Sequence, residues 1–261
     1  MKTHFLKYIS LATVLLLVYA CSTKKNTALT RGFHATTTKY NVLYNGKLAY
    51  DKGLEALKLK FHDDFSNILT VERMQPEKDA VFVQQEREPN FQRAEDKAIK
   101  ASQLHSIYVS GAEHNPQMDE VYLLLGKSRY HDNRYVPALE AFNYILLKYA
   151  DSDKIYEAKV WREKTNLRLE YHNLAVKNLK KLLKDENIQG QVKSEALATL
   201  AQGYIYSNAL DSAKNPLKEA IELTSNLDEK SRYTFILGQL NSRTGAKEEA
   251  IANFQKIIDY N

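Results

Sequence analysis

The sequence has 261 residues, enough for one large domain or two small ones. Hydrophobic residues make up 44% of it and charged residues 26%, so the chain can form a core and does not have the composition of a disordered protein. A net charge of +5 is too weak to indicate binding to nucleic acid, and a single cysteine excludes an intramolecular disulfide. Only 9 Gly and 5 Pro interrupt the chain, which favours long helices.

Residues 1–20 have the pattern of a lipoprotein signal peptide. Lys2 and Lys7 form a short positive region, and the run from Ile9 to Val18 is mostly apolar but too short to span a bilayer. It ends in Val-Tyr-Ala-Cys, a lipobox in which the thiol of Cys21 is the acceptor for diacylglycerol. The sequence therefore predicts lipidation of Cys21. The alternative is an ordinary signal peptide with a chance cysteine.

The residues after Cys21 predict where the chain is attached. No Asp follows Cys21 to indicate retention in the inner membrane, and no acidic cluster resembles a surface-export signal. We therefore expect a lipid anchor in the periplasmic face of the outer membrane. Residues 21–35 are polar and small, and they predict a flexible tether.

Residues 36–110 predict a divergent N-terminal helical repeat region with a long loop. The stretch 36–61 suggests a helical hairpin, and the side chains expected inside it are Tyr40, Tyr44, Tyr50, Leu54 and Leu57. Residues 68–92 contain two prolines and many charges, which indicate the loop. Residues 93–108 return to a helical pattern.

Residues 115–261 predict four tetratricopeptide-like repeats with a period of 37–38 residues. In the first unit, Gly126 and Ala138 are small where two helices cross, and Phe142 is expected to fill the space around the crossing. The same spacing of twelve residues between small residues recurs in units three and four. The predicted fold class is therefore all-α, a solenoid of stacked antiparallel helix pairs.

Two of the units depart from the pattern. In the second unit, Arg162 and Glu163 stand where a leucine and a glycine are expected. This unit is therefore either a degenerate repeat that only stacks on its neighbours or a repeat with a further function. The sequence stops at Asn261 inside the second helix of the fourth unit, which makes that repeat incomplete. We therefore expect this chain to be the N-terminal piece of a longer protein.

The motifs of common enzyme and metal sites are absent from the sequence. There is no HExxH, no GxSxG, no P-loop and no GxGxxG, and no cysteine remains after lipidation. His62, Asp63 and Asp64 could be imagined as metal ligands, but a solvated loop explains them as well. We expect no enzymatic activity, no cofactor, no metal and no small-molecule substrate.

The first helices of tetratricopeptide units line a concave groove, and here they predict a column of hydrogen-bond donors. Its members are Lys127, Tyr130, His131, Lys164, Arg168, Gln202, Tyr206, Gln239 and Arg243. The column contains aromatic side chains and no acid, which suits an acidic or C-terminal carboxylate segment of a protein partner. The alternative is that these long side chains simply solvate an exposed face.

One helix face that includes two residues of this column is a candidate docking site. Trp161, Lys164 and Arg168 are three and four residues apart, so they are neighbours on the helix of the most divergent unit. A Trp beside two cations can bind an acidic and aromatic segment of a partner. The alternative is that Trp161 packs against the neighbouring hairpin and is structural.

Four stretches together resemble one family. They are CSTKKNT (21–27), TKYNVLYNG (38–46), AKVWREKTNLRL (158–169) and RYTFILGQL (232–240). The chain resembles the SprE/PorW lipoproteins of the type IX secretion system, which also act in gliding motility. The resemblance implies a periplasmic linker that joins the outer-membrane translocon to other components of the secretion machine. The alternatives are a lipoprotein of the outer-membrane barrel assembly machinery, or a glycan-binding envelope lipoprotein with repeats as a spacer.

Overall fold

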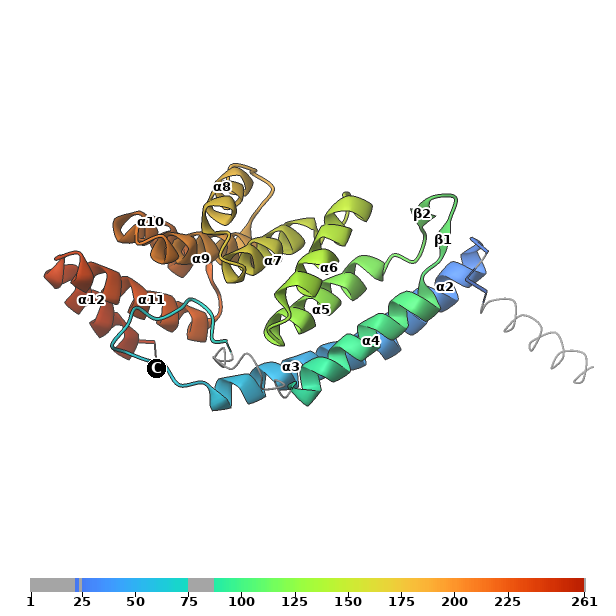
Figure 1. Cartoon of the computed structure of the whole chain (residues 1–261), viewed down its shortest axis with the longest axis horizontal. Coiled ribbons are helices and arrows are strands. Elements are labelled where there is room, and N and C mark those ends of the chain that lie inside the picture. Colours follow the sequence, from blue (N-terminus) through green and yellow to red (C-terminus); the bar gives the residue numbers. More distant parts are fainter. Residues whose placement is uncertain (1–21, 24, 75–86, 261) are drawn as a thin grey trace, which may run out of the picture.

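The computed structural model describes residues 22–23, 25–74 and 87–260, and over these residues the chain is an all-α solenoid (Figure 1). The β structure in this part is one short hairpin, in which Tyr108–Val109 pairs with Ala112–Glu113. The signal peptide and Cys21 lie outside the described residues. Within the described ranges, no helix has both the length and the apolar character that a membrane span requires.

The four predicted repeats each form a pair of helices. The pairs are α5 (Met118–His131) with α6 (Tyr135–Lys148), α7 (Ile155–Arg168) with α8 (His172–Leu182), α9 (Gly190–Tyr206) with α10 (Leu210–Leu223), and α11 (Leu227–Arg243) with α12 (Lys247–Ile258). Successive pairs stack on one another along the molecule (Figure 1).

One turn geometry recurs between the helices of every pair. Asn133, Glu170, Asn208 and Gly245 all have a positive φ, and they are 37, 38 and 37 residues apart. After each of them, a backbone N–H donates to the carbonyl five residues earlier at 2.8 to 2.9 Å, as Arg134 does to Arg129. This is the Schellman motif, which ends a helix by satisfying its last carbonyls. The period read from the sequence is therefore also the period of the helix ends.

Glycines in the first helices admit aromatic rings from the second helices. A Cβ added at Gly126 would lie 2.4 Å from the ring of Phe142, and one at Gly238 would lie 2.5 Å from the ring of Phe254. Phe142 is fully buried, whereas Phe254 is half-buried near the end of the solenoid. The two crossings have the same type of glycine–phenylalanine contact, but only the ring of Phe254 has room to move away.

We expect Gly126→Ala to lower the free energy of unfolding by about 1–2 kcal/mol. Overpacking in a core costs about 1–3 kcal/mol, while Ala is preferred over Gly in a helix by up to about 1 kcal/mol. Gly238→Ala is the matched control, and it should be nearly neutral because the ring of Phe254 can shift toward solvent. Urea unfolding measures both values. Equal losses in the two variants would contradict this account of the crossing.

The second repeat replaces the small residue at the crossing with a buried charge. Glu163 stands at the place of Gly126 and is 1% exposed. Its carboxylate accepts hydrogen bonds from Asn166 at 2.8 Å and from Asn178 of α8 at 3.2 Å, and it pairs with Arg162 at 2.6 Å. The departure from the repeat pattern is therefore a polar contact between α7 and α8 in place of a close crossing.

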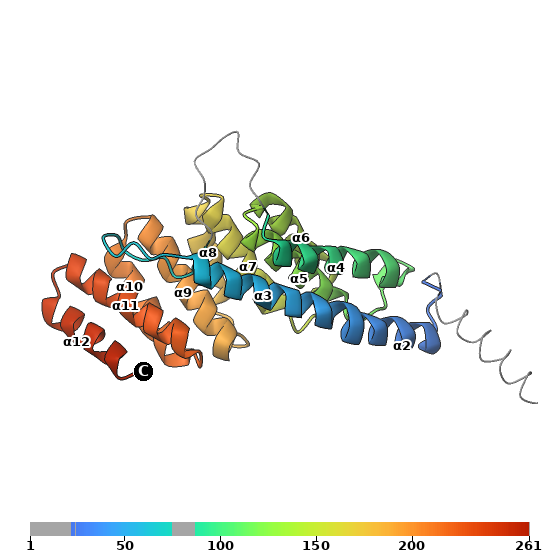
Figure 2. The same ribbon diagram turned by 90° about the horizontal axis from the view of Figure 1, so that it is seen from below.

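The N-terminal region differs from the predicted hairpin. Helix α2 (Ala28–Thr37), the π-helical turn η1 (Thr38–Leu43) and α3 (Tyr44–Lys60) form one continuous helix, which lies alongside α4 (Pro89–His105) (Figures 1 and 2). The prediction of a hairpin within 36–61 is wrong. Residues 28–35 are helical as well, although we expected them to belong to a flexible tether.

Close packing explains why the expected turn does not form. Asn-Gly at 45–46 is typical of a turn, but a Cβ at Gly46 would lie 2.7 Å from Leu124 of α5. The glycine therefore serves the contact between helices. Tyr40 and Tyr44, which we expected inside, are 69% and 64% exposed, whereas Tyr50 is buried as expected.

A buried carboxylate fixes α4 to the first repeat. Glu95 is 3% exposed and accepts from Arg134 at 2.7 Å through both oxygens and from Arg129 at 2.8 Å. Arg87 pairs with Glu95 too, and it binds Asp132 at 2.5 Å. Burial acts to raise the pKa of Glu95, but the arginines outweigh it and lower the pKa to about 2. This cluster holds the N-terminal helices on the solenoid.

The concave groove and the segment that fills it

The concave groove is lined by the first helices of the four repeats, α5, α7, α9 and α11. Residues 61–74, which follow α3, lie along it, and we call them the groove segment. Figure 1 shows this segment in cyan, leaving α3, reaching α11 and returning across the repeats. Its residues form neither helix nor strand. The predicted binding face is thus occupied by the chain itself.

Two glutamines of the groove bind the backbone of this segment. The Oε1 of Gln202 accepts the N–H of Val71 at 2.7 Å, and the Oε1 of Gln239 accepts the N–H of Leu69 at 2.9 Å. The Nε2 of Gln239 also donates to the carbonyl of Asn67 at 2.8 Å. These contacts recognise an extended backbone and do not depend on its side chains.

Two arginines of α11 extend this contact toward the start of the segment. Arg232 donates from Nε to the carbonyl of Thr70 at 2.7 Å and binds the carboxylate of Asp63 at 2.8 and 3.0 Å. Arg243 donates to the carbonyl of Ser66 at 2.8 Å. Asp63 is therefore held by an arginine, and the described residues contain no group of three side chains suited to a metal ion.

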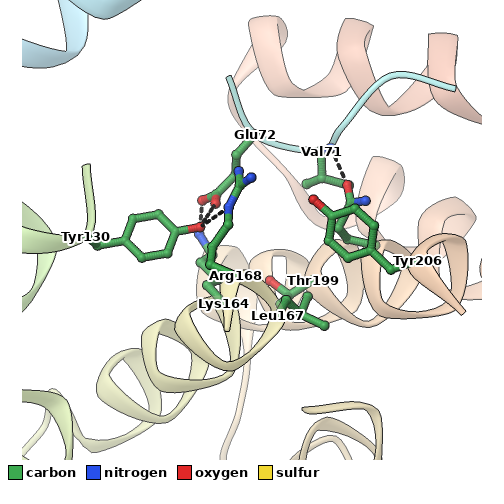
Figure 3. A pocket seen from close by; sticks show the side chains of 9 residues that line it. Val71, Glu72, Tyr130, Lys164, Leu167, Arg168, Thr199 and Tyr206 are labelled. Carbon is green, nitrogen blue, oxygen red and sulfur yellow. Dashed lines mark hydrogen bonds and ion pairs between the residues drawn. The ribbon is translucent and has the colours of Figure 1, made fainter. Parts of the chain in front are cut away.

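One carboxylate of the groove segment enters the centre of the groove (Figure 3). Glu72 binds the Nζ of Lys164 at 2.7 Å and accepts from the hydroxyl of Tyr130 at 2.7 Å. The Nε of Arg168 donates to the same hydroxyl at 3.3 Å, and Lys164 also pairs with Glu195 at 3.2 Å. Burial acts to raise the pKa of Glu72, but the charge of Lys164 outweighs it and lowers the pKa to about 2.

Three apolar side chains of the segment point into the core. Leu69 and Val71 join the hydrophobic cluster of α9, α10 and α11, and Met74 joins the cluster that contains Trp161 and Phe142. Leu69, Val71 and Met74 are 6%, 7% and 4% exposed. The segment therefore binds through apolar residues and through two carboxylates, those of Asp63 and Glu72.

The predicted column is thus only partly available to other molecules. Lys164, Tyr130 and Arg243 bind the groove segment, and Arg168 touches it through Tyr130. Tyr206 lines a small pocket beside Val71 and stacks on His172. Lys127 binds Glu157 at 3.2 Å and lies over the rings of Tyr50 and Trp161.

Trp161, Lys164 and Arg168 do not form an exposed face. Trp161 is 6% exposed and packs among Tyr130, His131 and Phe142, and Lys164 is 8% exposed. Trp161 therefore packs against the neighbouring hairpin, as the alternative to a docking site predicts. Sequence reasoning missed Glu72 and Arg232. The signal for Glu72 was the alternation of apolar residues in ILTVERM (68–74), inside the stretch that was taken for a loop.

Solved structures share the helical-repeat fold of this chain. BtubC from P. vanneervenii has a TM-score of 0.55 at 15% identity, and the match covers 90% of this chain and 91% of that one. This likeness shows the fold. MamA is also similar, with a TM-score of 0.48 at 18% identity over 66% of this chain and 89% of that one. A MamA RS-1 double mutant has a TM-score of 0.49 at 14% identity, and the match covers 83% of this chain and 94% of that one.

Sequence comparison assigns no family to the chain. No protein-family model matches it, and no curated protein matches it either.

Proposed function

We propose that this chain is a non-enzymatic scaffold that binds extended segments of other proteins in its concave groove. The observation that carries this is the recognition of the groove segment. Gln202, Gln239 and Arg232 bind its backbone, while Lys164 and Tyr130 bind the carboxylate of Glu72. A surface that binds the main chain of an extended peptide is a protein-binding surface.

We further propose that the scaffold is a lipoprotein of the type IX secretion machinery. The lipobox supports a lipid anchor at Cys21 in the periplasmic face of the outer membrane. The four stretches that resemble SprE/PorW proteins support a place among secretion components. The proposed partners are proteins of that machine.

Deletion of the gene should trap secreted cargo inside the cell while outer-membrane barrels assemble normally. A fatty-acid analogue should label the unchanged protein and not Cys21→Ala, because the only thiol of the chain is then absent. Immunoblots of cargo and heat-modifiability of barrel proteins measure the two phenotypes. Crosslinking in cells followed by mass spectrometry would identify the bound components.

The control for labelling is Ser22→Ala, which removes a neighbouring hydroxyl and keeps the thiol. Equal labelling of Cys21→Ala and the unchanged protein would refute the anchor. Defective barrels with normal secretion would instead support a role in barrel assembly.

A further inference from the structure

We propose that the groove segment is an intramolecular ligand, which an extended acidic segment of another protein displaces. The partner segment would carry apolar residues at alternate positions followed directly by a carboxylate, as Leu69, Val71 and Glu72 do. This rests on the proposed function, that the chain binds proteins, and it names the binding site and the chemistry of the partner.

The first step is that the groove recognises features any such segment would have. The contacts of Gln202 and Gln239 go to N–H and C=O groups, so they would form with another extended chain. Selection comes from the pockets for apolar side chains and from Lys164 and Tyr130, which bind a carboxylate. A partner segment that replaces the groove segment would therefore form the same types of backbone and carboxylate contacts.

The second step is that the groove segment leaves polar atoms of the groove unsatisfied. Gln202 Nε2, Trp161 Nε1 and His131 Nδ1 are buried, and none has a hydrogen-bond partner among the described residues. These three residues are 7%, 6% and 5% exposed. A buried polar atom without a partner costs about 1–3 kcal/mol. A partner segment that forms hydrogen bonds with these atoms would gain an interaction that the groove segment does not provide.

The third step is that space for such a partner exists beside Glu72. A cavity of about 410 Å³ lies between α3 and the groove, and His131, Trp161 and Lys164 line it on the groove side. A second pocket, of about 20 Å³, is lined by Glu72 and Tyr206 (Figure 3) and by Gln202. His131 and Trp161, which each carry an unpaired atom, thus line the larger cavity, and Gln202 lines the smaller pocket.

The fourth step is that release of the groove segment leaves the N-terminal helices attached. Helix α4 is held on the first repeat by the Glu95 cluster, and α3 packs on α4 through Phe91, whose ring fits against Gly53. These contacts lie outside the groove. The segment can therefore leave its site while both of the helices that flank it stay in place.

A labelled synthetic peptide of residues 66–74 (SNILTVERM) tests exchange with the purified protein. Glu72→Gln in the protein weakens the intramolecular ligand and leaves the groove intact. We expect the peptide to bind this variant about tenfold more tightly than the unchanged protein, since apparent affinity follows the fraction of open groove. The peptide with Gln in place of its Glu should bind the same variant about tenfold more weakly. Fluorescence anisotropy measures both affinities.

The matched control is Glu55→Gln, which removes an exposed carboxylate of α3 outside the groove and should leave peptide affinity unchanged. Leu69→Ala is a second variant that weakens the intramolecular ligand, and it should raise the affinity in the same direction as Glu72→Gln. Hydrogen exchange locates the site. The amides of Leu69 and Val71 should lose protection when the peptide binds, because their glutamine partners are then taken.

Three results would overturn the proposal. They are absence of peptide binding to the unchanged protein and to both variants, protection of the Leu69 and Val71 amides equal to that of α9, and a dimer formed by exchange of segments between two copies. Peptide exchange with normal secretion would leave this site standing and refute the secretion role. Defective secretion without peptide exchange would support the secretion role and refute this site.

Discussion

Glutamate in place of Lys164 is expected to lower the free energy of unfolding by about 3–5 kcal/mol, the usual effect of breaking a buried ion pair. Lys164 is 8% exposed, and its Nζ lies 2.7 Å from Glu72 and 3.2 Å from Glu195. The new carboxylate would face two others with no cation between them. Burial of the new charge and its repulsion by Glu72 and Glu195 would then both lower the free energy of unfolding. Urea unfolding of the purified variant measures the loss.

Two further variants separate charge at this site from charge in general. Lys181→Glu changes the net charge equally on the exposed end of α8, and it should lower the free energy of unfolding by no more than about 1 kcal/mol, the usual effect of a charge at a helix C-terminus. Combining Lys164→Glu with Glu72→Lys should recover more than half of the loss, because the direct pair is restored in reverse. A loss from Lys164→Glu as small as that from Lys181→Glu would show that the groove segment is not bound there.

The same contact changes how functional variants at Lys164 are interpreted. If Lys164 and Arg168 formed an exposed docking site, reversal of their charges would test that site without affecting stability. Lys164 instead holds two parts of the chain together, so a secretion defect in that variant would not distinguish docking from folding. Glu72→Gln is the better probe, since it changes the ligand and keeps the groove.

The solenoid could be predicted because its signals are local. Gly126 and Gly238 precede the partner alanine of their units by the same twelve residues, and each admits a ring from the helix that follows. Helix crossings and turns of this kind depend on residues less than one repeat apart. The second repeat deviated in sequence for an equally local reason, the hydrogen bonds between Glu163 and Asn178.

The occupant of the groove could not be predicted, because its contacts join distant parts of the chain. Val71 binds Gln202 across 131 residues, and Arg232 binds Asp63 across 169. The donors of the column indicated an acidic extended ligand, and Glu72 has that chemistry. Nothing in the local pattern indicated that the ligand belongs to the same chain. A charged stretch with prolines reads as a loop whether or not it lies in a groove.

Burial on the N-terminal helices was mispredicted for a related reason. Tyr40 and Tyr44 were placed inside because a hairpin would have covered them, but one continuous helix leaves them exposed. Gly46 decides this, since its contact with Leu124 keeps the helix unbroken against α5. The sequence shows the glycine but not the neighbour that requires it.

Acidification from pH 6.5 to pH 4.5 is expected to lower the free energy of unfolding by about 2–3 kcal/mol through His131 alone. This histidine is 5% exposed, and its ring lies 5.3 Å from that of Phe91 and 5.6 Å from that of Tyr50. Burial lowers its pKa to about 3. The charge of Glu72 opposes this, while those of Lys164, Lys127 and Arg168 act in the same direction as burial. The folded protein therefore keeps His131 neutral.

The sign of the effect follows from the two pKa values of His131. Between its unfolded value near 6.5 and its folded value near 3, the unfolded chain binds a proton that the folded chain does not. Stability is therefore lost as pH falls through that window, at up to about 1.4 kcal/mol per pH unit. Glu72 and Glu95, with folded pKa values of about 2 against 4.5, add losses only below about pH 4.5.

His131→Phe should reduce the slope of the profile between pH 6.5 and pH 4.5 to the contribution of the other histidines, among them His105, whose pKa is also lowered by burial. The loss below pH 4.5 should stay in place. Phenylalanine suits the site because the ring already stacks on Phe91 and packs edge-on against Trp161. His62→Phe, which replaces an exposed histidine of the groove segment, is the control and should keep the slope of the unchanged protein. Urea unfolding at a series of pH values measures all three. An unchanged slope in His131→Phe would mean that the proton is bound elsewhere on unfolding, and that His131 is not held neutral behind the groove segment.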